Sequence, residues 1–100
     1  LFMNRETSSL ISIETIKAII KKELGINLYQ RKVDPNCYHS KNINHSVIKN
    51  NNIFRGECWL VSLQKETKSG VDLELMNHNV KTEKELLDLI RKFKKVRKMI

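Results

Sequence analysis

Apolar residues recur with helical spacing near the start of the chain, in the segment IETIKAIIKKELG (13–25). Ser12 precedes this segment and is a favoured N-cap residue, while Gly25 stands where a C-capping glycine is expected. The segment therefore predicts an amphipathic helix. Its apolar stripe, spaced at i, i+3, i+7 and i+11, consists of Ile13, Ile16, Ile20 and Leu24.

A second helical pattern occupies the end of the chain. Thr82 and Glu85 form a capping box, in which each side chain bonds to the backbone amide of the other residue. Acidic residues lie near the start of this segment and basic residues near its end, as the helix dipole prefers. One broad face is apolar and consists of Leu86, Leu89, Ile90, Phe93, Val96 and Ile100.

Between the two helical segments the apolar period changes to two. The runs FRGECWLVSL (54–63) and VDLELM (71–76) alternate in this way. A polar loop that ends at Gly70 separates them, so they predict a β-hairpin. The first run is largely apolar on both faces, and we place Trp59 and the phenylalanines in the core.

The segment before this hairpin is harder to interpret. INLYQRKV (26–33) predicts a short strand, and Asp34-Pro35-Asn36 predicts a turn. Residues 36–52 are rich in Asn and predict a long loop, with one weak strand around His45–Ile48.

These elements predict a two-layer α+β fold. The expected sheet is antiparallel, with three to four strands, and the N-terminal and C-terminal helices pack on one of its faces. One hundred residues are enough for one domain. We assign residues 1–11 to a linker or chain end and residues 12–100 to a single domain. Because the first residue is Leu1 rather than Met, we expect a domain of a longer protein.

Composition adds a strong basic bias. The formal net charge is +8, from 19 Lys and Arg against 11 Asp and Glu. Such a balance favours an anionic partner: nucleic acid, an acidic membrane surface or an acidic protein. No apolar run reaches the roughly 18 residues of a membrane-spanning helix, and no signal peptide is recognisable. Two cysteines are too few for a disulfide framework, so we expect reduced thiols and a cytoplasmic location.

The histidines and cysteines do not have the spacing of a metal site. Zinc sites on loops usually show two pairs of ligands. Here Cys37 and His39 form one close pair, and no second pair matches it. Neither Cys37 nor Cys58 stands beside features that would activate a nucleophile. We expect no metal, no cofactor and no catalytic residue.

One catalytic alternative remains. His39, Lys41 and His45 lie close together in the sequence of a basic chain. Two histidines and a lysine are sufficient for general acid–base cleavage of RNA.

The basic residues are the strongest functional signal. Six of the last ten residues are Lys or Arg and none is acidic. Near an anionic membrane each such residue contributes roughly 1 kcal/mol to binding, and on nucleic acid the same residues contact phosphates without sequence preference. The candidate residues for binding anionic lipid headgroups are Lys17, Lys21, Lys22, Arg31, Lys32, Arg91, Lys92, Lys94, Lys95, Arg97 and Lys98.

The order of elements resembles one family, the kinase-associated C-terminal domain of the microtubule-affinity-regulating and septin-associated kinases. The similar segments are LGINLYQR (24–31), ECWLVSL (57–63), SGVDLEL (69–75) and KELLDLIRKF (84–93), and the resemblance covers about 85 residues from Ser12. It implies a non-catalytic module that binds acidic phospholipids such as phosphatidylserine. In some members of that family the domain also restrains its own kinase domain.

The resemblance also has a departure. The basic positions that match the family are Lys17, Lys21 and Lys22 of the first helix. After the hairpin turn, where the family often carries basic residues, this chain has Asp72 and Glu74. The departure concerns half of the usual lipid surface, for which the terminal basic cluster is the candidate replacement.

Two other functions stay open. The α-β-β-β-α proteins of the signal recognition particle have a similar order of elements and bind RNA on their sheet. We expect Glu57, Asp72 and Glu74 on the exposed sheet face here, where they would repel phosphate. The second alternative is a small protein-interaction domain like a toxin immunity protein. We expect a regulatory or targeting module without enzymatic activity, cytoplasmic and peripheral to the membrane.

Overall fold

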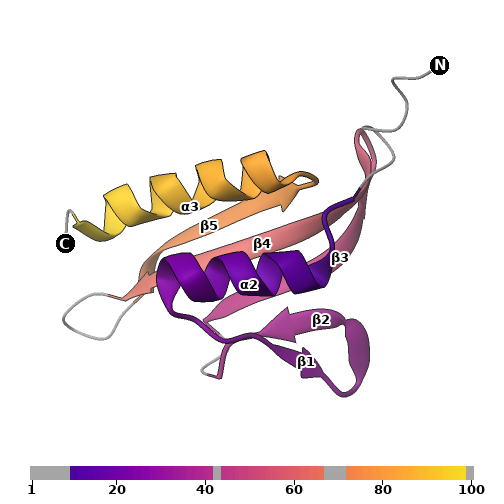
Figure 1. The fold of residues 1–100 in the computed structure, drawn as a ribbon, viewed down its shortest axis with the longest axis horizontal. Helices are drawn as coiled ribbons and strands as arrows, with labels where there is room; N and C mark the ends of the chain where they lie inside the picture. Colours follow the sequence, from indigo (N-terminus) through magenta and orange to yellow (C-terminus); the bar gives the residue numbers. More distant parts are fainter. Residues whose placement is uncertain (1–9, 42–43, 67–71, 99–100) are drawn as a thin grey trace.

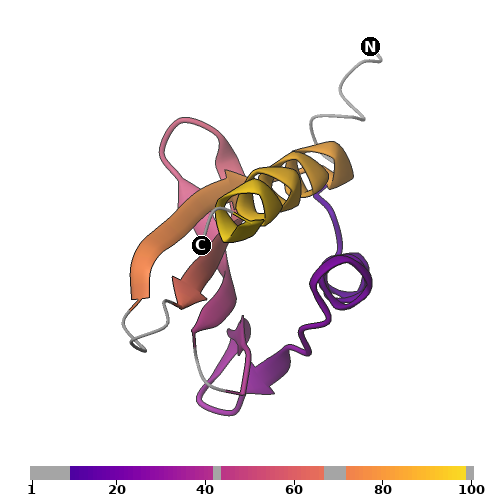
Figure 2. The same ribbon diagram turned by 90° about the vertical axis from the view of Figure 1, so that its left-hand side faces the viewer.

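The computed structural model describes residues 10–41, 44–66 and 72–98, with side chains for 10–41, 44–64 and 77–95. Five antiparallel strands follow one another in a single sheet of order β1-β2-β3-β4-β5. Two helices lie side by side on one face of this sheet (Figures 1 and 2). The predicted two-layer α+β fold is confirmed, with five strands instead of three to four. The elements are α2 (Ile13–Leu24), β1 (Tyr29–Arg31), β2 (Asp34–His39), β3 (His45–Asn52), β4 (Gly56–Glu66), β5 (Asp72–Val80) and α3 (Glu83–Lys98).

Both helices begin where the sequence predicts, and α2 also ends there. The Ser12 hydroxyl accepts the amide of Thr15 at 3.2 Å, which caps the start of α2. Gly25 ends α2 with φ 71°, and its amide bonds to the carbonyl of Lys21. At the start of α3, Glu85 N–H donates to the Thr82 hydroxyl at 3.2 Å, and Thr82 N–H donates back to the Glu85 carboxylate at 3.3 Å. The predicted capping box is confirmed.

The strands before the central hairpin differ from the prediction. The turn lies at residues 32–33, and Asp34-Pro35-Asn36 begins β2 instead of forming that turn. Pro35 is tolerated because it stands near the first residue of its strand. The expected long loop at 36–52 is mostly strand, because it contains the rest of β2 and all of β3. Gly70, Val71 and Ile100 lie outside the described residues.

The register assigns the side chains of the sheet to two faces. Val47 pairs with Val61, and Ile48 pairs with Leu60, so alternate residues of β3 and β4 point to opposite sides. Val47, Trp59, Val61, Leu63 and Val80 lie on the helix-facing side and are buried. From α2 and α3 the core receives Ile16, Ile20, Leu86, Leu89, Ile90 and Phe93.

The segment just before α2 is part of this core. The Ile11 carbonyl accepts the indole N–H of Trp59 at 2.8 Å. The Ile11 amide donates to the Lys81 carbonyl at 2.9 Å. Leu10 and Ile11 pack against the buried cluster, so the fold begins before the expected boundary at Ser12.

Phe54 is not in the core or in a strand, contrary to the prediction. It lies in the turn between β3 and β4, and 92% of its surface is exposed. The neighbouring Ile53 is 87% exposed. The sequence does contain a signal for this turn. Asn52 and Gly56, both of residue types that favour turns, stand on either side of residues 53–55.

Candidate functional site

The two helices run in the same direction across the sheet, so their basic C-terminal halves reach the same end of the molecule (Figure 1). One ion pair joins them there. The Lys94 ammonium lies 2.8 Å from the Glu23 carboxylate. The hydrogen bond from Lys94 lowers the pKa of Glu23 below its ordinary value. Lys94 was expected to face lipid, but its charge is already compensated by α2.

The outer side of α3 carries four exposed cations, which we call the α3 ridge: Lys84, Arg91, Lys92 and Lys95. The buried face of α3 points the other way, towards the sheet and α2. Asp88 is the acidic residue on this side. Its carboxylate lies 3.2 Å from Lys84 and 2.8 Å from Arg91. These hydrogen bonds hold the pKa of Asp88 below its ordinary value.

Because one carboxylate is shared between two cations, the α3 ridge keeps a surplus of positive charge. Lys92 and Lys95 are exposed, and no ion pair of theirs is found among the described side chains. The side chains of Arg97 and Lys98 lie outside the described residues, although both residues belong to the backbone of α3.

The three candidate cations of α2 form a second group. The Lys17 ammonium lies 5.8 Å from the ring centroid of Tyr38, a cation–π contact with β2. Lys21 and Lys22 are exposed in the last turn of the helix, where the dipole favours them.

Arg31 and Lys32 form a third group on the β1–β2 hairpin, and both are exposed. In both views this hairpin lies at the bottom of the molecule and α3 lies near the top (Figures 1 and 2). The fold therefore does not gather the predicted cations on one surface.

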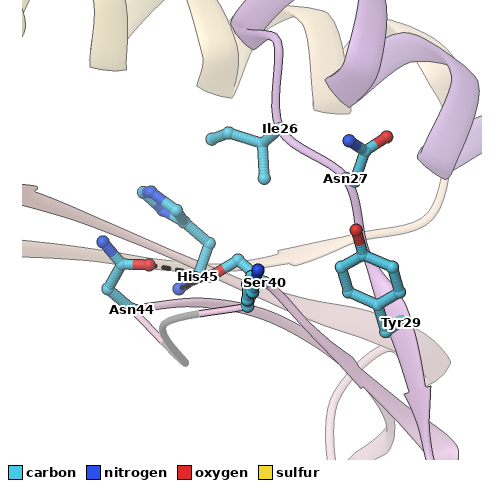
Figure 3. A pocket seen from close by; sticks show the side chains of 7 residues that line it. Ile26, Asn27, Tyr29, Ser40, Asn44 and His45 are labelled. Carbon is cyan, nitrogen blue, oxygen red and sulfur yellow. Dashed lines mark hydrogen bonds between the residues drawn. The ribbon is translucent and has the colours of Figure 1, made fainter.

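A hollow of about 300 Å³ lies between the α2–β1 connection and the turn between β2 and β3 (Figure 3). Polar groups that line the hollow are hydrogen-bonded to one another. The Ser40 hydroxyl donates to Asn44 Oδ1 at 2.7 Å and accepts the amide of His45 at 3.2 Å. The His45 ring accepts the Gln64 amide at Nδ1 and packs edge-on against Phe93. The lining residues are Ile26, Asn27, Tyr29, Ser40, Lys41, Asn44 and His45.

The hypothetical RNA-cleaving group is not assembled in this hollow. His45 pairs with Leu63 and shares its helix-facing side, whereas His39 pairs with Ser46 on the opposite side. His39 Nδ1 bonds to the neighbouring carbonyl of Ser40 at 2.8 Å. The two imidazoles therefore lie on different faces of the sheet and do not converge on one proton-transfer site.

The cysteines and histidines do not form a metal site in the described part of the chain, where no cluster of three or more potential ligands is found. Cys37 and Cys58 are free and buried. The Cys58 thiol donates to Asn79 Oδ1 at 3.2 Å, which fixes it within the sheet.

The sheet face away from the helices does not carry Glu57. Glu57 pairs with Asn51 on the same side as Trp59, and its carboxylate lies 3.4 Å from Lys49. Strand alternation thus places Glu57 on the helix-facing side, contrary to the expectation, although its side chain is 62% exposed near the start of β4. The side chains of Asp72 and Glu74 lie outside the described set. On β3 and β4 this face consists of Ser46, Ile48, Asn50, Cys58, Leu60 and Ser62, of which Cys58 is buried, the others are partly buried and none is a cation.

Within the described residues, neither helix is long and apolar enough to cross a bilayer. Comparison of the chain with protein-family models, with curated proteins and with solved structures found no match. The assignment of a function therefore depends on the surface chemistry of the chain itself.

Proposed function

We propose that the chain is a non-catalytic regulatory or targeting module that binds anionic phospholipid such as phosphatidylserine. It would act at the cytoplasmic side of a membrane as a peripheral protein. The resemblance to kinase-associated domains adds a second part to the proposal, namely that the module belongs to a kinase and also contacts that kinase's catalytic domain.

The observation that carries the proposal is the surplus of exposed cations on the α3 ridge. Four cations lie there beside one carboxylate, which pairs with only two of them, and the ridge lies on the outer side of a helix that is anchored by its buried face. Each Lys or Arg near an anionic membrane contributes roughly 1 kcal/mol to binding. Three uncompensated charges therefore give an attraction of about 3 kcal/mol, which suits reversible recruitment.

RNA is the alternative anionic partner, and the sheet gives it little support. Single-stranded RNA is usually held by aromatic side chains and cations along a strand face. The face of β3 and β4 that points away from the helices carries partly or fully buried Ser, Asn, Ile, Leu and Cys side chains instead. Binding of RNA would therefore depend on the same helical cations and would lack a stacking platform.

The test replaces Lys92 and Lys95 with Gln. Both residues are exposed, and Gln has nearly the same helix propensity as Lys, so the fold should be retained. We expect the affinity for phosphatidylserine vesicles to fall by about 2 kcal/mol, or roughly 30-fold. The measurement is co-sedimentation with vesicles across a salt titration, with phosphatidylcholine vesicles and a mixed RNA measured in parallel.

The matched control replaces Arg31 and Lys32 with Gln, because this pair removes the same charge from the β1–β2 hairpin. Equal losses in the two variants would show that net charge, and not the α3 ridge, governs binding. Binding of the wild-type chain to RNA alone would replace the proposal by a nucleic-acid function. No binding to either partner would reject an anionic partner of these two kinds.

A further inference from the structure

The tip of the β3–β4 hairpin exposes the two most accessible large apolar side chains of the described residues. Ile53 is 87% exposed and Phe54 is 92% exposed. Both follow Asn52 at the end of β3, and β4 begins again at Gly56. Isolated exposed apolar residues are common on protein surfaces, whereas contiguous exposed apolar surface, to which two adjacent large side chains contribute, marks interaction sites.

Hydrogen bonds within the tip hold this pair in place. The Asn52 side-chain oxygen accepts the amides of Phe54 at 2.8 Å and of Arg55 at 3.0 Å. Gly56 has φ 80°, a left-handed conformation that residues with a Cβ rarely adopt. The turn therefore presents Ile53 and Phe54 in one defined geometry.

A second set of bonds fastens the tip to the start of α3. The Arg55 guanidinium donates to the Glu85 carboxylate at 2.6 Å and to the Asn79 carbonyl at 3.0 Å. The Lys81 ammonium donates to the Arg55 carbonyl at 2.8 Å. Because these residues connect the turn to the end of β5 and the first turn of α3, the tip and the helix are positioned as one unit.

The tip and the outer side of α3 also share one side of the molecule. In both views the end of the β3–β4 hairpin and α3 lie along its upper side (Figures 1 and 2). The buried face of α3 points away from this side, so the α3 ridge points outward with the tip. A flat surface can then meet the cations and the apolar pair together.

From this arrangement we infer that Ile53 and Phe54 insert into the interfacial region of an anionic bilayer while the α3 ridge contacts its headgroups. The inference depends on the proposed lipid-binding function and adds the orientation of the domain and an apolar anchor. Cations attract the protein to the surface but lose strength in salt, whereas burial of apolar side chains does not depend on screening. Aromatic side chains are also favoured at the membrane interface. A protein pocket would accept the apolar pair equally well, but it would not require the neighbouring surplus of positive charge.

The β1–β2 hairpin provides a matched control. Val33 at its tip is 81% exposed and stands beside the exposed cations Arg31 and Lys32. It resembles the β3–β4 tip in composition but lies at the bottom of the molecule in both views. If any exposed apolar tip sufficed, the two hairpins would behave alike, whereas the inferred orientation places only the β3–β4 tip in the bilayer.

The first experiment places a fluorescent reporter at each tip, in the variants Phe54→Trp and Val33→Trp. The native Trp59 is buried and gives a constant background in both. On adding phosphatidylserine vesicles we expect a blue shift of the emission of Phe54→Trp and its quenching by lipids with brominated acyl chains. We expect neither change for Val33→Trp.

A second experiment measures vesicle affinity by co-sedimentation. Ile53→Ser combined with Phe54→Ser should reduce partitioning by about 100-fold, because two buried apolar side chains are lost. Val33→Ser should leave partitioning unchanged within about twofold. The thermal midpoint of each variant, compared with that of the wild type, separates loss of binding from loss of folding.

The possible outcomes separate a failure of the membrane-insertion inference from a failure of the proposed lipid-binding function. If the wild-type chain binds phosphatidylserine vesicles but the Phe54→Trp reporter does not respond, the inference is overturned and the lipid-binding function stands. If the Val33→Trp reporter responds instead, the orientation is wrong. If the wild-type chain binds no vesicles, the proposed function fails, and the exposed pair is then assigned to a protein partner.

Discussion

At the scale of single residues, Trp59 connects several parts of the fold. Its indole N–H bonds to Ile11, which ties the segment before α2 to β4. Its ring meets Tyr38 edge-on with centroids 6.3 Å apart, and the Lys49 ammonium lies 5.6 Å from its centroid. Loss of this side chain would therefore affect the core, the sheet and the N-terminal segment together.

Trp59→Ala should destabilise the domain by about 3–5 kcal/mol, as large aromatic truncations in a core do. Trp59→Phe keeps much of the apolar volume but removes the donor to the Ile11 carbonyl, and we expect a smaller loss of about 1–2 kcal/mol. Urea unfolding followed by circular dichroism measures both values. A Trp59→Ala variant that unfolds at the wild-type urea concentration would show that the assigned core is wrong.

Trp59 and Phe54 also show what residue patterns can predict. Both belong to the run that the sequence predicts as one strand, and hydrophobicity alone placed both in the core. The structure buries Trp59 and exposes Phe54. The difference comes from the backbone: Asn52 and Gly56 close a turn around Phe54, and this turn chemistry outweighs the apolar character of its residues.

At the scale of elements, the helices were predictable because their signals are local. Capping residues and apolar spacing lie within a few positions of one another, so α2 and α3 follow directly from the sequence. β2 was not predictable, because Asp34-Pro35-Asn36 is typical of a turn and its exposed residues show no alternation. This strand forms because β1 and β3 supply its hydrogen-bond partners, and the sequence does not show which segments will pair.

Glu85 makes the start of α3 sensitive to pH. Partial burial raises the pKa of its carboxyl, but bonds from the Lys81 amide, the Arg55 guanidinium and the Thr82 amide outweigh this effect, so the net pKa lies below its ordinary value of 4.5. A carboxyl with a lowered folded pKa stabilises the fold above its unfolded pKa, and this contribution disappears as the pH falls through the folded pKa.

Glu85→Gln should accordingly be less stable than the wild type at neutral pH, and the difference should shrink below about pH 4. Urea midpoints of both proteins at several pH values give the comparison. Glu83→Gln is the control, because Glu83 lies in the same helical turn and is exposed. A difference between wild type and Glu85→Gln that stays constant from neutral to acidic pH would argue against the ion-paired role of this carboxylate.

At the scale of the whole molecule, the sequence predicted the amount of charge but not its distribution. Eleven cations were assigned to lipid binding, yet Arg31 and Lys32 lie on the β1–β2 hairpin, away from α3, and Lys94 pairs with Glu23. The direction of each side chain follows from how the helices and hairpins pack, and that packing depends on contacts distant in sequence. The position of the exposed tip residues Ile53 and Phe54 relative to α3 was not predictable either, because it depends on the long-range bonds from Arg55 to Asn79 and Glu85.

The net charge of +8 makes a last prediction about the domain as a whole. Cations exceed acids across the surface, and the ion pairs described are few and largely exposed, so mutual repulsion among cations should outweigh attraction in the folded state. Raising NaCl from about 20 mM to about 300 mM shortens the Debye length from roughly 20 Å to below 10 Å and screens this repulsion. The thermal midpoint should therefore rise with salt while affinity for anionic vesicles falls. A midpoint that falls together with vesicle affinity would mean that favourable ion pairs dominate the electrostatics of the fold.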